Sequence, residues 1–194
     1  MNPAPRLTRV ADVAPQPWRN GGGATRELLR IPGDDRWALR LSLADIERDG
    51  PFSAFPGTQR WFAVVQGESV TLRFGNHAHV LTLDSPALLF DGAAAPHCTL
   101  THGATRDLNL MLRGTSGTLQ RAAAGQAWDE EFDQRGFLAL SAGELHDRAG
   151  AATRLAPFTL AWGLARGPWL FTPHGPGPCG WWVGASGTQL QGAP

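Results

Sequence analysis

Hydrophobic and polar residues alternate along much of this chain, as they do in strands with one buried face. In residues 37–43 one face carries a tryptophan and three leucines, and the other carries alanine, arginine and serine. Residues 69–74 alternate in the same way. A Gly-Asn turn pair and a second alternating run over 78–83 follow, which together predict a hairpin. Further short strands are expected over residues 86–90, 97–102 and 107–112.

The second half of the chain shows the same style with weaker signals. Residues 136–140 and 158–164 predict strands, and residues 169–171 and 181–183 are short apolar segments. Residues 119–128 are the one segment in which a short helix is expected. The composition changes near residues 114–117, so we expect two units, residues 1–114 and 115–194. Many short strands separated by turn residues predict an all-β sandwich or barrel with little helix.

Composition and charge exclude several classes of function. The 194 residues carry 17 basic and 17 acidic side chains, which argues against a nucleic-acid partner. The chain has no lysine and no tyrosine, which excludes Schiff-base, P-loop-lysine and phenolic acid–base chemistry. Cys98 and Cys179 lack zinc-site spacing, and nothing supports a disulfide between them. With no signal peptide and no run of membrane-spanning length, we expect a cytoplasmic location and no membrane contact.

Three segments combine glycine, polar and aromatic residues in ways that suit a ligand site. Residues 18–25 contain three consecutive glycines, which suit a close approach to a ligand, with an ordinary hairpin loop as an equal alternative. Residues 49–57 make successive turns before Arg60 and, taken alone, favour a structured turn. Residues 106–113 alternate polar residues with leucines, so the polar face either satisfies itself or lines a polar cavity.

The histidines offer one candidate metal pair. His77 and His79 lie on one face of a predicted strand, which is a plausible spacing for two ligands. They stand beside the Gly75-Asn76 turn and no third ligand can be placed, so exposed hairpin histidines are the favoured interpretation. No Ser/His/Asp or Cys/His arrangement follows from the spacing, and we assign no catalytic residue.

Four ordered motifs resemble those of the HutD/Ves family, and the likeness is strong over residues 7–113. Departures occur at Leu108 and Leu112, where the family often has phenylalanine and arginine. The motifs are Trp18-x-Asn20-Gly21-Gly22-Gly23-x-Thr25, then Trp37-x-x-Arg40-x-Ser42-x-Ala44 continuing into Asp49-Gly50-Pro51-Phe52-Ser53-x-Phe55-Pro56-Gly57-x-x-Arg60, then Phe90-Asp91-Gly92, and finally Asp107-x-Asn109-x-Met111.

The resemblance implies a bicupin, two fused RmlC-like β-barrels, with an N-terminal barrel at 1–114 and a smaller cupin-like barrel at 115–194. Cupin enzymes usually hold a metal through His-x-His, a Glu and a later His. No histidine lies between Gly50 and Gly67, where the first of these would fall. We therefore expect neither a metal nor a cofactor.

The family is linked to histidine utilisation, and its members are thought to bind N-formylglutamate and to moderate the pathway. The resemblance therefore implies a protein that binds a small acidic metabolite and is more a sensor than an enzyme. Arg40 and Arg60 are the expected carboxylate partners, because arginine pairs bidentately with carboxylates. Asp107 is expected to orient an arginine. The full set of expected ligand-binding residues is Trp18, Asn20, Gly21, Gly22, Gly23, Thr25, Arg40, Ser42, Phe52, Ser53, Arg60, Asp107, Asn109 and Met111.

Two alternatives belong to other classes of protein. One is a metal-independent cupin enzyme, an isomerase or hydrolase on a small polar acid, with Asp107 or a histidine as its base. The other is a stress-associated regulator that binds another protein. A homodimer is compatible with all three interpretations, because cupins often pair through sheet edges.

Overall fold

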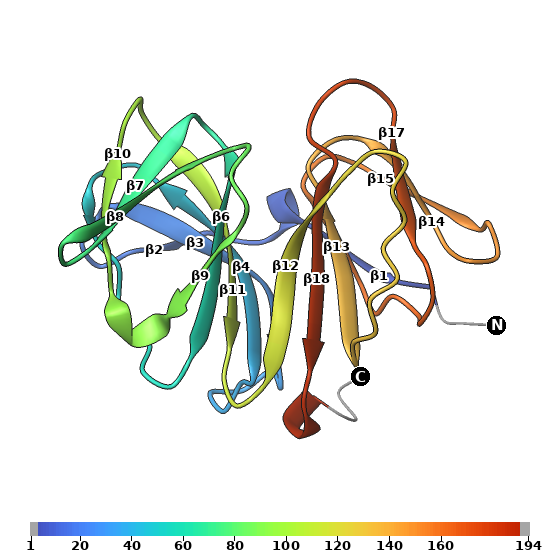
Figure 1. The fold of residues 1–194 in the computed structure, drawn as a ribbon, viewed down its shortest axis with the longest axis horizontal. Helices are drawn as coiled ribbons and strands as arrows, with labels where there is room; N and C mark the ends of the chain where they lie inside the picture. The colour runs from blue at the N-terminus through green and yellow to red at the C-terminus, as the bar shows by residue number, and fades with distance from the viewer. Residues whose placement is uncertain (1–3, 191–194) are drawn as a thin grey trace. The chain divides into compact units, whose positions relative to one another are not determined.

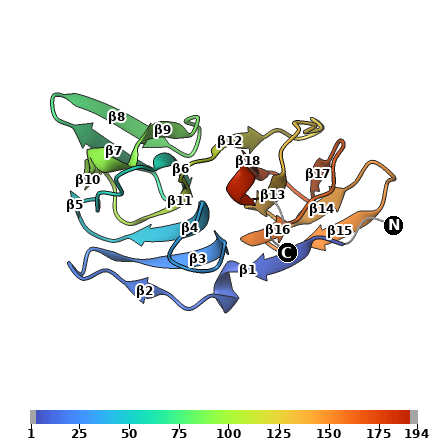
Figure 2. The same cartoon turned by 90° about the horizontal axis from the view of Figure 1, so that it is seen from below.

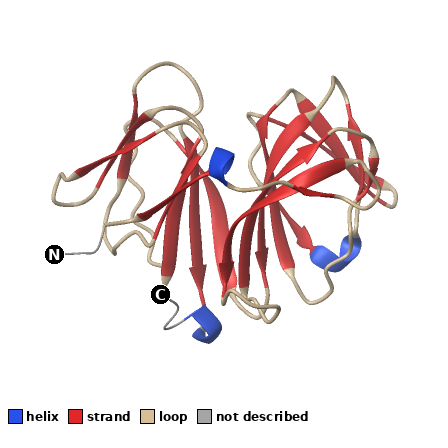
Figure 3. Ribbon diagram, turned by 180° about the vertical axis from the view of Figure 1, so that it is seen from behind, coloured by secondary structure: helices blue, strands red, loops and turns tan. Residues whose placement is uncertain are grey.

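The computed structural model describes residues 4–190, which are almost entirely strands and loops (Figure 3). The helical elements in this range are the short 3-10 segments Val10–Asp12, Gly92–Ala94 and Thr188–Leu190. The prediction of an all-β protein is confirmed. None of the helices among these residues has the length and hydropathy of a membrane span.

Contacts between residues divide the chain into two compact units. Residues 14–114 form the first, which we call the central unit. Of the described residues, 115–190 form the second together with 4–13, and we call it the split unit. Residues 4–13 thus lie in the split unit, whereas the first barrel was expected to span residues 1–114, of which 1–3 lie outside the described residues. The cause is strand β1 (Arg6–Arg9), which pairs antiparallel with β16 (Thr159–Trp162), more than a hundred positions away along the chain.

The central unit contains two antiparallel sheets, and Figure 2 shows β7, β8 and β10 lying across from β3 and β4. The six-stranded sheet has the order β2-β3-β4-β11-β6-β9, and the four-stranded sheet has the order β5-β10-β7-β8. The strands of the first are β2 (Gln16–Pro17), β3 (Gly23–Ile31), β4 (Leu39–Ile46), β11 (Thr105–Leu112), β6 (Gln59–Gln66) and β9 (Leu88–Asp91). Those of the second are β5 (Gly50–Pro51), β10 (His97–Leu100), β7 (Ser69–Phe74) and β8 (His77–Thr82).

The alternation in the sequence explains how these sheets enclose a core. Val70 and Leu72 of β7 are fully buried and pack in one cluster with Phe62 and Val64 of β6. Gly75 takes a φ of 56°, a conformation that glycine adopts without steric cost, and so allows the tight turn into β8. The predicted hairpin over residues 69–83 is confirmed as β7 and β8.

The split unit also contains two sheets, and its interior is filled with aromatic rings. Phe137 lies 4.7 Å from Phe171 and 4.4 Å from Trp182, measured between ring centroids, and Trp182 stacks on Trp128. The sheets have the orders β1-β16-β13-β18-β12 and β15-β14-β17 (Figure 1). The remaining strands are β12 (Ser116–Ala122), β13 (Gln134–Ala139), β14 (Gly143–His146), β15 (Ala152–Leu155), β17 (Leu170–Pro173) and β18 (Gly180–Ser186).

The helix expected over residues 119–128 is absent, and that prediction is wrong. The segment begins inside β12, which pairs along its whole length with β18. It ends at Trp128, whose backbone exchanges hydrogen bonds with Trp169. The alanines at 122–124 favour a helix locally, but pairing with a distant strand outweighs that preference.

Removal of the Phe137 ring tests the packing of the split unit. Phe137 is completely buried, so Phe137→Ala leaves a cavity between Phe171 and Trp182. We expect the free energy of unfolding to fall by about 3–5 kcal/mol in urea denaturation. Leu89→Ala, at a side chain that is 45% exposed, is the control and should change stability by about 0.5 kcal/mol or less. Equal losses in the two variants would contradict this packing.

Candidate functional site

The register of β4, β11 and β6 places polar residues side by side on one face of the six-stranded sheet. Met111 of β11 stands between Arg40 of β4 and Arg60 of β6. In the next row of the same face, Asn109 stands beside Ser42. Side chains two apart on a strand point to the same face. The two rows therefore bring Arg40, Arg60, Ser42 and Asn109 together on one face of this sheet.

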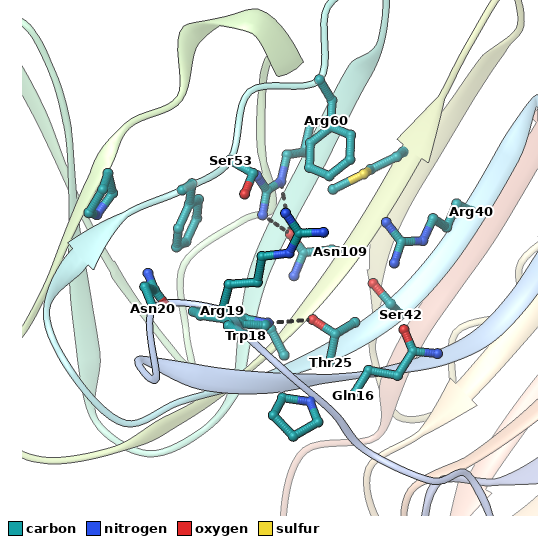
Figure 4. A pocket seen from close by; sticks show the side chains of 16 residues that line it. Gln16, Trp18, Arg19, Asn20, Thr25, Arg40, Ser42, Ser53, Arg60 and Asn109 are labelled. Atoms are coloured by element: carbon teal, nitrogen blue, oxygen red, sulfur yellow. Dashed lines mark hydrogen bonds between the residues drawn. The ribbon is translucent and has the colours of Figure 1, made fainter. Parts of the chain in front are cut away.

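A cavity of about 730 Å³ lies over these four residues. Figure 4 shows Arg19 reaching from its loop toward Arg60 and Asn109, while Arg40 and Ser42 lie on the other side of the cavity. The lining contains three arginines and no carboxylate. The lining residues are Gln16, Pro17, Trp18, Arg19, Asn20, Thr25, Arg40, Ser42, Ala44, Pro51, Phe52, Ser53, Phe55, Arg60, Asn109 and Met111.

Arg60 is the most deeply buried charge in this cavity, with 6% of the residue exposed. It donates from Nε and Nη2 to Oδ1 of Asn109, at 2.9 and 2.6 Å. Its guanidinium also lies over the rings of Phe52 and Phe90, at 4.5 and 5.4 Å from the centroids. Burial, and then the like charge of Arg40, lower the pKa of Arg60 to about 9. Arg60 is therefore still a cation at neutral pH.

Arg40 forms an ion pair with Glu27, an acidic residue that is not part of the cavity lining. Its Nε donates to Oε2 of Glu27 at 2.7 Å, and Arg30 donates from Nη2 to the same oxygen at 2.8 Å. Glu27 is on β3 and Arg40 on β4. The contact uses the Nε side of the Arg40 guanidinium, and Arg40 itself lines the cavity.

The glycine-rich segment forms the loop that leads into β3. Asn20 accepts from the backbone N–H of Gly22 at 3.0 Å, and the N–H of Gly21 donates to the carbonyl of Trp18. A side chain at Gly23 would collide with the backbone of β4, since an added Cβ would lie 2.1 Å from the Asp45 carbonyl. The three glycines, which were expected to bind the ligand, are not among the residues that line the cavity. Instead, they shape the loop that carries Trp18 and Asn20.

Trp18 and Thr25 support each other at the edge of the cavity. The indole Nε1 of Trp18 donates to Oγ1 of Thr25 at 2.8 Å, a bond drawn in Figure 4. Thr25 lies on β3 and Trp18 in the loop that precedes it. This bond satisfies the one polar atom of the indole. The rest of the ring is apolar and forms part of the cavity wall.

Asp107 lies on the same face of β11 as Asn109 but does not reach the cavity lining. It is fully buried, accepts from the Thr105 hydroxyl at 2.8 Å, and has no hydrogen-bond partner for Oδ1. Burial raises its pKa to about 8, so the carboxyl is mainly neutral at neutral pH. Asp107 was expected to orient an arginine, but the hydrogen bond of its side chain goes to Thr105.

The structure brings most of the predicted site residues together around one cavity. Six lining residues were missed. Three of these, Pro17, Arg19 and Pro51, stand next to a predicted residue in the sequence, and the other three lie two positions from one. The predicted residues in the lining are Trp18, Asn20, Thr25, Arg40, Ser42, Phe52, Ser53, Arg60, Asn109 and Met111, and the missed ones are Gln16, Pro17, Arg19, Ala44, Pro51 and Phe55.

The candidate metal ligands lie elsewhere. His77 and His79 are exposed on β8, and the ring of His79 contacts Phe74 edge-on. Across residues 4–190, no group of three or more His, Cys, Asp or Glu side chains is arranged to hold a metal ion. Cys98 and Cys179 are buried free thiols.

Comparison with known protein families and solved structures shows which family the chain belongs to. The model of the HutD family matches residues 10–176. The chain belongs to the HutD family. A crystal structure of a conserved protein of unknown function from Pseudomonas aeruginosa PAO1 is similar, with 32% identity and a TM-score of 0.82 over 94% of this chain and 98% of that one. HutD from Pseudomonas fluorescens SBW25, solved in a formate condition, gives 25% identity and a TM-score of 0.79 over the same shares.

Curated protein sequences that are similar to this chain align with about half of it. An uncharacterized 21.2 kDa protein in the hutC 3' region of Pseudomonas putida is 41% identical over 108 residues, which is 55% of this chain and 57% of that protein. Protein Ves of Citrobacter koseri is 39% identical over 50% of this chain and 51% of its own length. The chain thus spans about half the length of the curated relatives it matches. The predicted HutD/Ves resemblance is confirmed.

Stability should depend on pH through Asp107. The folded protein keeps this proton up to about pH 8, whereas an unfolded chain releases it near the ordinary value of 3.8. The stabilising contribution is therefore complete below pH 3.8 and is lost as pH rises through about 8. We expect the free energy of unfolding of the wild type, relative to that of Asp107→Asn, to decrease from pH 5 to pH 8.

Urea denaturation at pH 5, 6, 7 and 8 measures this difference. Asp35→Asn is the matched control, because the Asp35 side chain is fully exposed, and it should follow the wild type. Parallel curves for the wild type and Asp107→Asn would show that Asp107 titrates normally in the folded protein.

Proposed function

We propose that this chain is a HutD-type binding protein that takes a small acidic metabolite such as N-formylglutamate and moderates histidine utilisation. The observation that carries the proposal is the charge of the cavity. Arg19, Arg40 and Arg60 line it, and no carboxylate does. Such a cavity favours an anion, and a ligand carboxylate would provide the counter-charge that the lining lacks.

The rest of the lining suits the other parts of such a ligand. N-formylglutamate carries two carboxylates, a formamide and a short methylene chain. Ser42 and Asn20 offer hydrogen-bonding groups for the formamide or the second carboxylate, and Phe52 and Met111 offer apolar surface for the methylenes. The lining thus combines apolar walls with convergent polar groups, which fix the orientation of a ligand in small-molecule sites.

Calorimetric titration with N-formylglutamate tests the proposal. We expect saturable binding to the wild type, with affinity that falls as salt is raised because the attraction is between charges. Arg40→Ala and Arg60→Ala should each weaken binding by about 1.5–3 kcal/mol, the usual value of a hydrogen bond to a charged group. Arg73→Ala is the control, since Arg73 is an exposed arginine on β7 of the same unit.

Thermal unfolding of each variant distinguishes lost binding from lost folding. Arg60→Met keeps most of the side-chain volume of this buried residue and serves where Arg60→Ala is too unstable. Unchanged affinity in both Arg40→Ala and Arg60→Ala would place the ligand elsewhere. Turnover of the titrant would favour an enzyme instead, and indifference to every small acid would favour a protein partner.

A further inference from the structure

We infer that Glu27 is a positioning residue for the ligand, acting through Arg40 in a bridge of Arg30, Glu27 and Arg40. This inference rests on the proposed binding of a carboxylate in the central unit. Glu27 lies outside the cavity lining, so it would act only through the arginine that it holds.

The hydrogen bonds define how Glu27 holds Arg40. A single oxygen, Oε2, accepts from Arg40 Nε at 2.7 Å and from Arg30 Nη2 at 2.8 Å. The side chains of Glu27 and Arg40 are 17% and 16% exposed, so solvent screens this pair less than a surface pair. Anchoring at Nε restricts rotation of the guanidinium and presents its terminal Nη groups for two parallel bonds to a carboxylate.

An irregularity in β3 makes this bridge possible. The pairing of β3 with β4 shifts register between Glu27 and Leu29, the signature of a β-bulge. In a regular strand, residues three apart point to opposite faces. The bulge lets Glu27 and Arg30 share one face, where Glu27 pairs with Ser42 and Arg30 with Arg40. Bulges often re-aim side chains beside functional sites.

The charges support the same role. Burial by itself raises the pKa of Glu27, but its bonds and charge interactions with Arg30 and Arg40 outweigh this and lower it. Glu27 is therefore an anion at neutral pH. Its charge lies directly beside Arg40, the arginine whose like charge is, after burial, the second cause of the lowered pKa of Arg60.

The chain contains a matched bridge that does not touch the cavity. Asp45 accepts from Arg26 and from Arg106 Nε, which donates at 2.6 Å. These residues lie on β3, β4 and β11, the sheet region that also carries Glu27 and Arg40. Asp45 points to the face of β4 opposite Ser42 and Ala44. Asp45→Asn thus removes a comparable ionic bridge without altering the lining.

The test combines a probe of Arg40 itself with a binding cycle. In the ¹⁵N-labelled protein, the Arg40 Nε–H signal, assigned through Arg40→Gln, should exchange slowly with water because it is bonded to Glu27. Glu27→Gln should make its exchange fast, and Asp45→Asn should not. Thermal unfolding of each variant without ligand records any general loss of structure.

The binding cycle uses N-formylglutamate with the wild type, Glu27→Gln, Arg40→Gln and the double variant. We expect Glu27→Gln to raise the Kd by about tenfold, and to have no further effect when Arg40→Gln is already present. Asp45→Asn should leave the Kd unchanged.

Two results would overturn the inference. One is slow Nε–H exchange of Arg40 that persists in Glu27→Gln, and the other is an equal loss of affinity in the Arg40→Gln background. If the wild type binds no N-formylglutamate, the proposed function fails, while the exchange measurement still decides whether Glu27 positions Arg40.

Discussion

The burial of Arg60 within the central unit is the constraint on which the site depends. A buried charge is costly unless its hydrogen-bonding groups are satisfied. Within residues 4–190, no carboxylate forms an ion pair with this guanidinium. Asn109 accepts two of its bonds, and the rings of Phe52 and Phe90 cover its faces. The result is a fixed positive charge in the cavity wall, with neutral partners that leave its attraction for anions largely uncancelled.

Two acids of the central unit, the buried Asp107 and the partly buried Glu27, leave the charge of Arg60 uncancelled. Asp107 lies on the same face of β11 as Asn109, the partner of Arg60. It is mainly neutral at neutral pH, because burial raises its pKa. Glu27 is ionised, yet its charge is shared between Arg30 and Arg40 outside the cavity. Neither acid neutralises Arg60 directly.

The interior of the split unit differs from that of the central unit, because the rings of Phe137, Phe171 and Trp182 fill it.

The sequence was sufficient for the features that depend on local pattern. Alternation identified β4, β7 and β11, and with them the polar faces that carry Arg40 and Asn109. It could not show the pairing of β1 with β16, since that ladder depends on residues far along the chain. The helix expected over 119–128 failed for the same reason.

Within the site, the sequence indicated residue types but not directions. It could not show that the glycine amides at 21 and 22 bond within their own loop. It could not show that Asp107 is absent from the cavity lining, although Asn109, two residues on, is part of it. The bulge that brings Glu27 and Arg30 to one face reverses the period-two pattern, so alternation alone assigns these two residues to opposite faces.

A crystal structure of the protein with N-formylglutamate tests the central claim most directly. The account predicts a ligand carboxylate within hydrogen-bond distance of Arg60, with Arg40 still bonded to Glu27 and bound to the ligand through its Nη groups. Ordered ligand away from these arginines, or a cavity without ligand at a saturating concentration, would contradict it.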